Sequence, residues 1–210
     1  MMRLRFSPFP GYVHTVEAVI TYGGLKDRFT YVANDPFEPG NGLAEVNPLS
    51  TVPTLELPTG ETLYGGPVIY EYVDSLHAKP KLFTPGERLL TVRRQLWLAD
   101  SLFDHYVRLF VEGREPAGSW RAPYLERFFK KVVQALDAFE QECTSFPEAL
   151  DIAQVRLIGT LAFITERLPK ASDRVGNLFP PHHWRETRPK LAAWYDRRSQ
   201  DPIFTTKLTD

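Results

Sequence analysis

The hydrophobic pattern of the chain changes after the first seventy-odd residues, and this change limits the fold more than any other feature. Before it, short β-branched or aromatic runs alternate with helical ones, and after it strand signals nearly vanish. Residues 77–86, HAKPKLFTPG, contain prolines and a glycine and are typical of a linker. We therefore predict an α/β domain over residues 1–78 and an all-helical domain over residues 85–210.

The first part of the chain is predicted to form one sheet covered by helices. Residues 54–57 and 62–64 flank a Pro-Thr-Gly turn and are expected to form a hairpin. The full order is β-α-β, a long connection, then β-β-α, which describes a small α/β domain. Strands are predicted at residues 4–6, 29–32, 54–57 and 62–64, and helices at residues 13–22 and 68–76.

Apolar residues in the second part recur at the spacing of helices whose inner faces form a core. This pattern is typical of a helical bundle, and no internal repeat is visible. The predicted helices cover residues 89–110, 125–139, 152–161 and 191–195.

Composition excludes several classes of partner. The formal net charge of −1 provides no basic face for nucleic acid and no polybasic segment for anionic lipid. The N-terminal apolar run is too short for a signal peptide, and no apolar stretch is long enough to span a membrane. The single cysteine, Cys143, cannot form an intrachain disulfide or a multi-cysteine zinc site. We predict a cytoplasmic protein without nucleic-acid, membrane or metal partners.

The most specific stretch is NPLSTVPTL at residues 47–55. It resembles the NPxxxVPxL segment of the glutathione S-transferase superfamily. SPFPGYV at residues 7–13, LYGGPVIYEY at 63–72 and RPKLAAWYDR at 188–197 resemble three further family segments, in the expected order. The chain is therefore similar to the cytosolic members whose active residue is Ser or Cys. The resemblance implies an N-terminal thioredoxin-like domain, an all-helical C-terminal domain and a homodimer.

The same resemblance implies that glutathione is the cofactor. In that family the Val-Pro bond of the segment is cis, and the backbone of the residue before the proline binds the cysteinyl part of glutathione as a neighbouring strand would. A second family segment holds the γ-glutamyl end. Carried onto this sequence, the glutathione contacts fall at Phe9, Gly11, Thr51, Val52, Pro53, Gly65 and Gly66.

The chain departs from the family at the group that activates the thiol. Lining up SPFPGYV with the Ser-Pro-x-Ser and Ser-Pro-x-Cys forms puts Pro10, which has no hydroxyl, thiol or N–H, at the catalytic position. Lowering a thiol pKa by about two units requires roughly 2.7 kcal/mol. A helix N-terminus supplies only about 0.3–1 kcal/mol of this. The candidates for the remainder are the Ser7 hydroxyl, the N–H groups of Gly11 and Tyr12, and the Tyr12 phenol.

A second departure lies in the segment for the γ-glutamyl end. Gly65 and Gly66 stand where the family usually has an acidic residue and a serine, and Thr51 replaces the usual Gln or Lys before Val-Pro. Weaker glutathione binding is expected, and Gly66→Ser is expected to strengthen it by supplying a donor. The backbone N–H groups at Gly66 can still take the carboxylate.

By resemblance, the chain is expected to be an enzyme that conjugates glutathione to an apolar electrophilic small molecule, or adds and eliminates it. A glutathione-dependent double-bond isomerase needs the same thiolate and is an alternative. A non-catalytic member that binds glutathione, another ligand or a protein is a second alternative, favoured by the two departures. The hydrophobic electrophile is expected between Phe9, Tyr106, Phe110 and Trp120.

Overall fold

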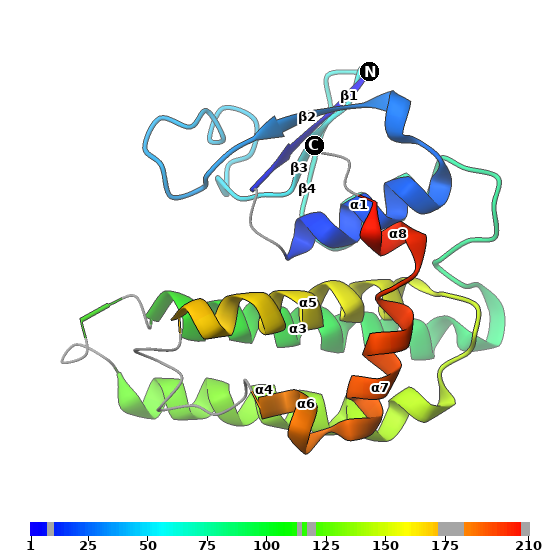
Figure 1. Ribbon diagram of the computed structural model, residues 1–210. Coiled ribbons are helices and arrows are strands. Elements are labelled where there is room, and N and C mark those ends of the chain that lie inside the picture. Colours follow the sequence, from blue (N-terminus) through cyan, green and yellow to red (C-terminus); the bar gives the residue numbers. More distant parts are fainter. Residues whose placement is uncertain (8–10, 113–114, 117–120, 172–182, 207–210) are drawn as a thin grey trace. The chain divides into compact units, whose positions relative to one another are not determined.

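The computed structural model describes residues 1–7, 11–112, 115–116, 121–171 and 183–206. These residues form two compact units, one of residues 1–89 with the segment that begins at Asp201, and one of residues 90–200. The first unit is a mixed sheet with helices and the second is helical, as predicted (Figure 1). The segment from Asp201 was expected in the helical domain, but it belongs to the first unit because α8 (Pro202–Thr205) contacts α1.

The sheet of the first unit has the strand order β2-β1-β3-β4. β1 (Met2–Phe6) pairs in parallel with β2 (Phe29–Ala33) and antiparallel with β3 (Thr54–Glu56). β3 also pairs antiparallel with β4 (Thr62–Tyr64), which confirms the predicted hairpin. Alternate residues of β1 are buried, as expected for a strand with one face against a core.

Helices of the first unit lie against the apolar face of this sheet. α1 (Tyr12–Gly23) runs along the sheet in Figure 1 and contacts α2 (Gly66–Ser75). Gly24 caps the C-terminus of α1, and its left-handed backbone, φ 67°, lets its N–H reach the carbonyls of Ile20 and Thr21. A short 3-10 turn, η1 (Lys26–Arg28), then leads into β2.

The predicted linker is fixed to the first unit by side chains at the end of α2. The buried Asp74 carboxylate accepts hydrogen bonds from the N–H groups of Leu82, at 3.0 Å, and Phe83, at 3.2 Å. The Lys81 ammonium donates to the carbonyls of Asp74, at 2.7 Å, and His77. These contacts satisfy carbonyls that the helix itself leaves without partners. The 3-10 turn η2 (Gly86–Arg88) follows.

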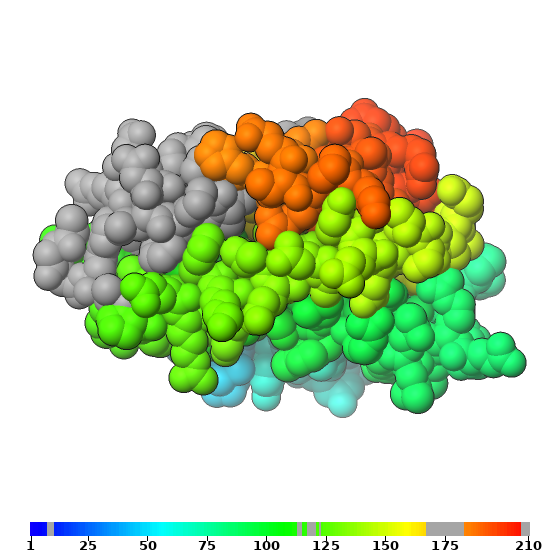
Figure 2. Space-filling view, turned by 90° about the horizontal axis from the view of Figure 1, so that it is seen from below, coloured from blue at the N-terminus to red at the C-terminus, as the bar shows by residue number. Residues whose placement is uncertain are grey.

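The second unit is a bundle whose predicted apolar stripes form the core. Asp151 caps α5 by accepting from the N–H of Gln154 at 3.0 Å. On the face shown in Figure 2, α6 and α7 (orange) lie alongside α4 (yellow-green). The prediction for α5 was too short, and α6 was not predicted. The elements are α3 (Leu89–Glu112), α4 (Ala122–Glu142), η4 (Cys143–Ser145), α5 (Ile152–Ala171), α6 (Trp184–Thr187) and α7 (Pro189–Arg198).

An ion pair is buried in this bundle. Nε of Arg156 on α5 lies 2.5 Å from Oδ1 of Asp100 on α3, and the two side chains are 0% and 5% exposed. The guanidinium carbon also lies 4.5 Å from the ring centroid of Phe103. Each charge compensates the other where water does not reach them, so removing one leaves the other buried without compensation. The pair therefore fixes α3 against α5.

We predict that breaking this pair destabilises the protein more than replacing it. Arg156→Met leaves the Asp100 carboxylate buried without its partner and should lower the free energy of unfolding by about 3–5 kcal/mol. The double variant Asp100→Leu/Arg156→Met should recover most of this loss, because an apolar pair needs no charge compensation. Urea unfolding of the three proteins measures both effects. A double variant as unstable as the single one would contradict the prediction.

Candidate functional site

The first segment of the site joins β1 to α1. Ser7 directly follows β1 and is buried, whereas Phe9 and Pro10 lie outside the described residues. Gly11 precedes α1 with φ 150° and ψ −119°, a conformation that favours glycine. No side chain caps α1 at Gly11, and its first turn carries no acidic residue. The first turn therefore keeps the positive end of the helix dipole without a negative side chain.

The second segment is the start of α2, which also begins at glycine. Gly65 has φ 89°, no side chain caps the helix there, and the first turn has no acidic residue. A Cβ atom on Gly66 would lie 2.5 Å from Cδ1 of Tyr12 and 2.5 Å from the hydroxyl oxygen of Tyr70. The Tyr12 ring thus lies directly against the start of α2. The N-termini of α1 and α2 are neighbours, an arrangement that favours a negatively charged group.

This contact corrects the expectation for Gly66→Ser. A serine at position 66 would bring its Cβ far inside van der Waals distance of the Tyr12 ring, so the ring would have to move. The space that a side chain at this position takes is already filled. A glycine is required at position 66 because the Tyr12 ring and the Tyr70 hydroxyl lie too close for a side chain, and not because of its backbone conformation.

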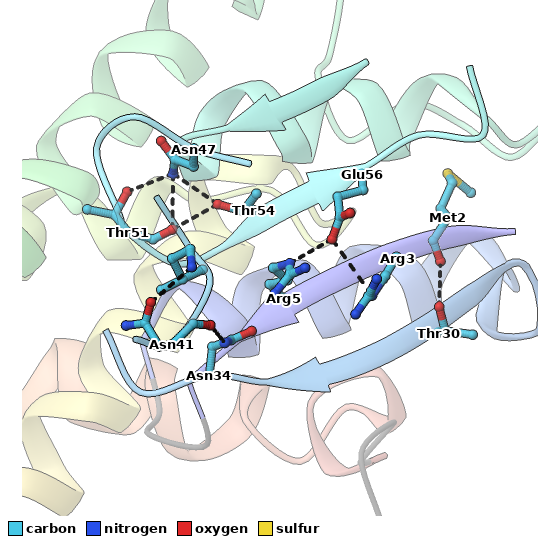
Figure 3. A network of polar contacts seen from close by, with 11 residues as sticks. Met2, Arg3, Arg5, Thr30, Asn34, Asn41, Asn47, Thr51, Thr54 and Glu56 are labelled. Carbon is cyan, nitrogen blue, oxygen red and sulfur yellow. Dashed lines mark hydrogen bonds and ion pairs between the residues drawn. The ribbon is translucent and has the colours of Figure 1, made fainter. Parts of the chain in front are cut away.

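The third segment is the proline loop, residues 47–53, in which the Val52-Pro53 bond is cis as the resemblance implied. The wholly buried Asn47 carboxamide donates to the Thr51 carbonyl at 3.1 Å and to the Thr54 hydroxyl at 2.9 Å (Figure 3). Its oxygen accepts from the N–H of Leu49 at 2.9 Å. The Thr54 hydroxyl in turn donates to the Thr51 carbonyl at 2.8 Å. One side chain thus fixes the loop to the first residue of β3.

Strand register brings the three segments to one end of the sheet. Arg5 of β1 is opposite Thr54 of β3, and Thr54 is opposite Tyr64 of β4. In antiparallel pairs the chains continue in opposite directions past the last pair. Beyond Thr54, the residues that follow β1 therefore run toward Val52, and those that follow β4 run toward Pro53. Ser7, Val52 and Gly65 therefore lie at the same end of the sheet.

Two protein-family models match this chain, one in each unit. The model described as "Glutathione S-transferase, N-terminal domain" matches residues 6–76, and that described as "Glutathione S-transferase, C-terminal domain" matches residues 122–197. The two matches together span both units. This chain belongs to the glutathione S-transferase superfamily.

Relatives agree over nearly the whole chain. The GST-like protein YibF of Escherichia coli K12 is 26% identical over 91% of this chain and 100% of its own. A glutathione transferase family member from Pseudomonas fluorescens Pf-5, solved with bound glutathione, is 28% identical, covers 97% of both chains and has a TM-score of 0.84. A structure from the same strain with bound S-(propanoic acid)-glutathione is 28% identical, covers 97% of this chain and 96% of that one, and has a TM-score of 0.79.

A further superfamily member was solved with glutathione from Methylobacillus flagellatus KT. It is 26% identical, covers 97% of both chains and has a TM-score of 0.82. These similarities extend through both units, so the transferase fold is shared as a whole.

The residues expected to contact the electrophile are only partly described. Tyr106 and Phe110 of α3 both meet the ring of Phe163, with centroids 6.1 and 6.4 Å apart. Burial raises the pKa of the Tyr106 phenol, which therefore stays protonated at neutral pH. Phe9 and Trp120 lie outside the described residues.

Cys143 does not have the properties of a reactive thiol. It lies just after α4, is buried, and its Sγ is 3.5 Å from the Glu140 carbonyl oxygen. Burial, together with the charge of Glu140, raises the pKa of this thiol. Over the described ranges, no group of three potential metal-ligating side chains is found. In that same part of the chain, no helix is both long and apolar enough to cross a membrane.

Two residues of the site were missed from sequence. Asn47 belongs to the family segment quoted above, but that segment gave no reason for its side chain. Tyr70 follows Gly66 by four residues on α2, and helical side chains lean toward the N-terminus, so its ring reaches back to the first turn. The i, i+4 spacing from a helix-starting glycine is the signal that could have found it.

We predict that the Asn47 carboxamide stabilises the proline loop. Asn47→Ala removes a buried acceptor from the Leu49 N–H and a donor from Thr51 and Thr54, so the free energy of unfolding should fall by about 2–4 kcal/mol. Asn41→Ala is the matched control, because the Asn41 side chain bonds Asp35 and Leu43 elsewhere in the same connection.

Urea unfolding and limited proteolysis measure the two effects. Asn41→Ala should be milder, because Asn41 is only half-buried, and should leave the proline loop resistant to cleavage. An Asn47→Ala protein within about 1 kcal/mol of wild type, with an uncleaved loop, would contradict the prediction.

Proposed function

We propose that this chain is a glutathione transferase that binds glutathione at the end of the sheet where Ser7, Val52 and Gly66 gather. The observation that carries the proposal is the strand register, which directs the residues after β1 and β4 toward the proline loop. In this proposal the Val52 backbone pairs with the cysteinyl group, and the starts of α1 and α2 hold negative charge. Glutathione bound to the P. fluorescens and M. flagellatus relatives supports the choice of ligand.

Ser7 is proposed as the group that activates the thiol. Glutathione supplies a thiolate nucleophile, and the protein must favour the charged form over the neutral one. Ser7 directly follows β1, at the end of the sheet where β1 continues past Thr54 toward Val52. The cysteinyl group is proposed to pair with Val52. Its hydroxyl donates one hydrogen bond to the thiolate, and the N–H groups of Gly11 and Tyr12 at the start of α1 add the field of the helix.

Conjugation to an apolar electrophile is the proposed reaction. A relative that holds S-(propanoic acid)-glutathione, a thioether of glutathione, supports a site with room for a group on the sulfur. Phe9, Tyr106, Phe110 and Trp120 remain the proposed contacts for that group. A cytoplasmic location belongs to the same proposal, because glutathione is kept reduced there. An isomerase would use the same thiolate and return glutathione unconsumed, which product analysis separates from conjugation.

We predict that Ser7→Ala raises the pKa of the bound glutathione thiol. One hydrogen bond to a charged acceptor contributes about 1.5–3 kcal/mol, which corresponds to about one to two pKa units. Thiolate absorbance of the complex against pH measures the shift, and turnover of an activated aryl chloride at neutral pH should fall with it. Ser75→Ala, at the exposed far end of α2, is the control and should change neither quantity.

The same titration separates the alternatives. Wild-type protein that binds glutathione without lowering its thiol pKa supports the non-catalytic reading. A lowered pKa that Ser7→Ala leaves in place assigns activation to the N–H groups of α1. Absence of glutathione binding contradicts the proposed function itself.

We also propose that the chain forms a homodimer, as the resemblance implies. Leu90 and Trp97 on α3 are 80% and 71% exposed, and residues seven apart lie on the same face of a helix. Large exposed apolar side chains on one helix face are typical of a protein interface. Because a homodimer presents the same face twice, a second copy of this chain is the proposed partner.

We predict that Trp97→Glu converts the dimer to a monomer. A charge at the centre of the paired faces would lose its water without gaining a partner. Light scattering after size-exclusion chromatography measures the mass. Phe37→Glu, which changes an exposed apolar residue in the β2–β3 connection, is the control and should remain dimeric. A monomeric wild-type protein, or a dimeric Trp97→Glu protein, would contradict the proposal.

A further inference from the structure

The position of the Tyr12 ring bears on which end of glutathione this residue serves. By its place at the start of α1, Tyr12 is a candidate for thiol activation. We infer instead that Tyr12 is a positioning residue for the γ-glutamyl end, and that it replaces the side chain that position 66 lacks. The inference rests on the proposed function.

Space around Gly66 provides the first argument. The site for a Cβ atom on Gly66 lies 2.5 Å from Cδ1 and 2.8 Å from Cε1 of Tyr12. These atoms form one edge of the ring, and the carbon that bears the hydroxyl is bonded to Cε1. The edge of the Tyr12 ring therefore occupies the volume in which the Cβ atom of a serine at position 66 would lie. A tyrosine hydroxyl can donate one hydrogen bond, as a serine hydroxyl does.

Tyr70 restricts the positions that the Tyr12 ring can take. Its hydroxyl oxygen lies 2.5 Å from the same Cβ position, and its side chain is wholly buried. Tyr12 and Tyr70 thus approach one point at the start of α2 from different helices. Tyr70 is held within the core and cannot move aside easily. Its hydroxyl therefore restricts the Tyr12 ring to its position against Gly66.

Distance across the sheet provides the second argument. The order β1-β3-β4 separates the end of β1, where Ser7 lies, from the end of β4 by two strand spacings, about 9–10 Å. A hydrogen bond requires an approach of about 3 Å. The edge of the Tyr12 ring against Gly66 therefore lies on the side of the site at the end of β4, and in this proposal the thiol at the end of β1 is left to Ser7.

The consequence is a division of roles along glutathione. Tyr12 should contribute to affinity for the γ-glutamyl group without changing the ionisation of the thiol. The dipeptide cysteinylglycine lacks the γ-glutamyl group and keeps the thiol, so it serves as the probe that separates the two ends.

The test compares glutathione and cysteinylglycine on the full chain by calorimetric titration, with thiolate absorbance against pH on the glutathione complex. Tyr12→Phe keeps the ring and removes the hydroxyl. It should weaken glutathione binding about tenfold or more and leave both the affinity for cysteinylglycine and the pKa of the bound glutathione thiol unchanged. Tyr31→Phe is the control, because the buried Tyr31 hydroxyl on β2 has no hydrogen-bond partner among the described residues.

A second variant tests replacement directly. Tyr12→Ala/Tyr70→Phe/Gly66→Ser removes both the ring and the hydroxyl that approach the Cβ position of residue 66 and places a serine hydroxyl there, and it should bind glutathione more tightly than Tyr12→Ala/Tyr70→Phe. The inference is overturned if Tyr12→Phe raises the thiol pKa, if it weakens both ligands equally, or if it leaves glutathione affinity unchanged. Wild-type protein that binds neither ligand overturns the proposed function and this inference together.

Discussion

The carboxamide of Asn47 is the contact on which the rest of the site depends. It is buried and bonds the Thr51 carbonyl, the Thr54 hydroxyl and the Leu49 N–H, so a single side chain fixes both ends of the proline loop. Thr54 is also the first residue of β3 and is paired with both neighbouring strands. The network therefore places the loop relative to the sheet, and through the sheet relative to the residues that follow β1 and β4.

The starts of two helices complete the site from that same frame. α1 and α2 both begin at glycine, without a side-chain cap and without an acidic residue in the first turn, so each keeps the positive end of its dipole. The Tyr12 ring brings these two ends together, because it lies against Gly66. In the proposed site, backbone groups and tyrosines take the place of the acidic and serine side chains that the family resemblance led us to expect.

Local patterns were sufficient to predict most of the fold. The β-α-β and β-β-α order and the hairpin at residues 54–64 depend on short-range periodicity and on a Pro-Thr-Gly turn, and the structure agrees with them. Contacts between distant segments could not be predicted in this way. Tyr12 and Gly66 meet only after the sheet has brought α1 and α2 together, so the crowding at Gly66 is invisible in the sequence. The packing of α8 on α1 is of the same kind.

Hydrogen exchange of the full chain with and without glutathione tests the central claim most directly, because the claim names the backbone that the ligand contacts. Exchange should slow in peptides that cover residues 47–56 and 62–72, since the ligand would pair with the N–H groups of the proline loop and of the start of α2. Peptides from α4 serve as the internal reference and should not change. Unchanged exchange in the first-unit peptides at a saturating glutathione concentration would contradict the account.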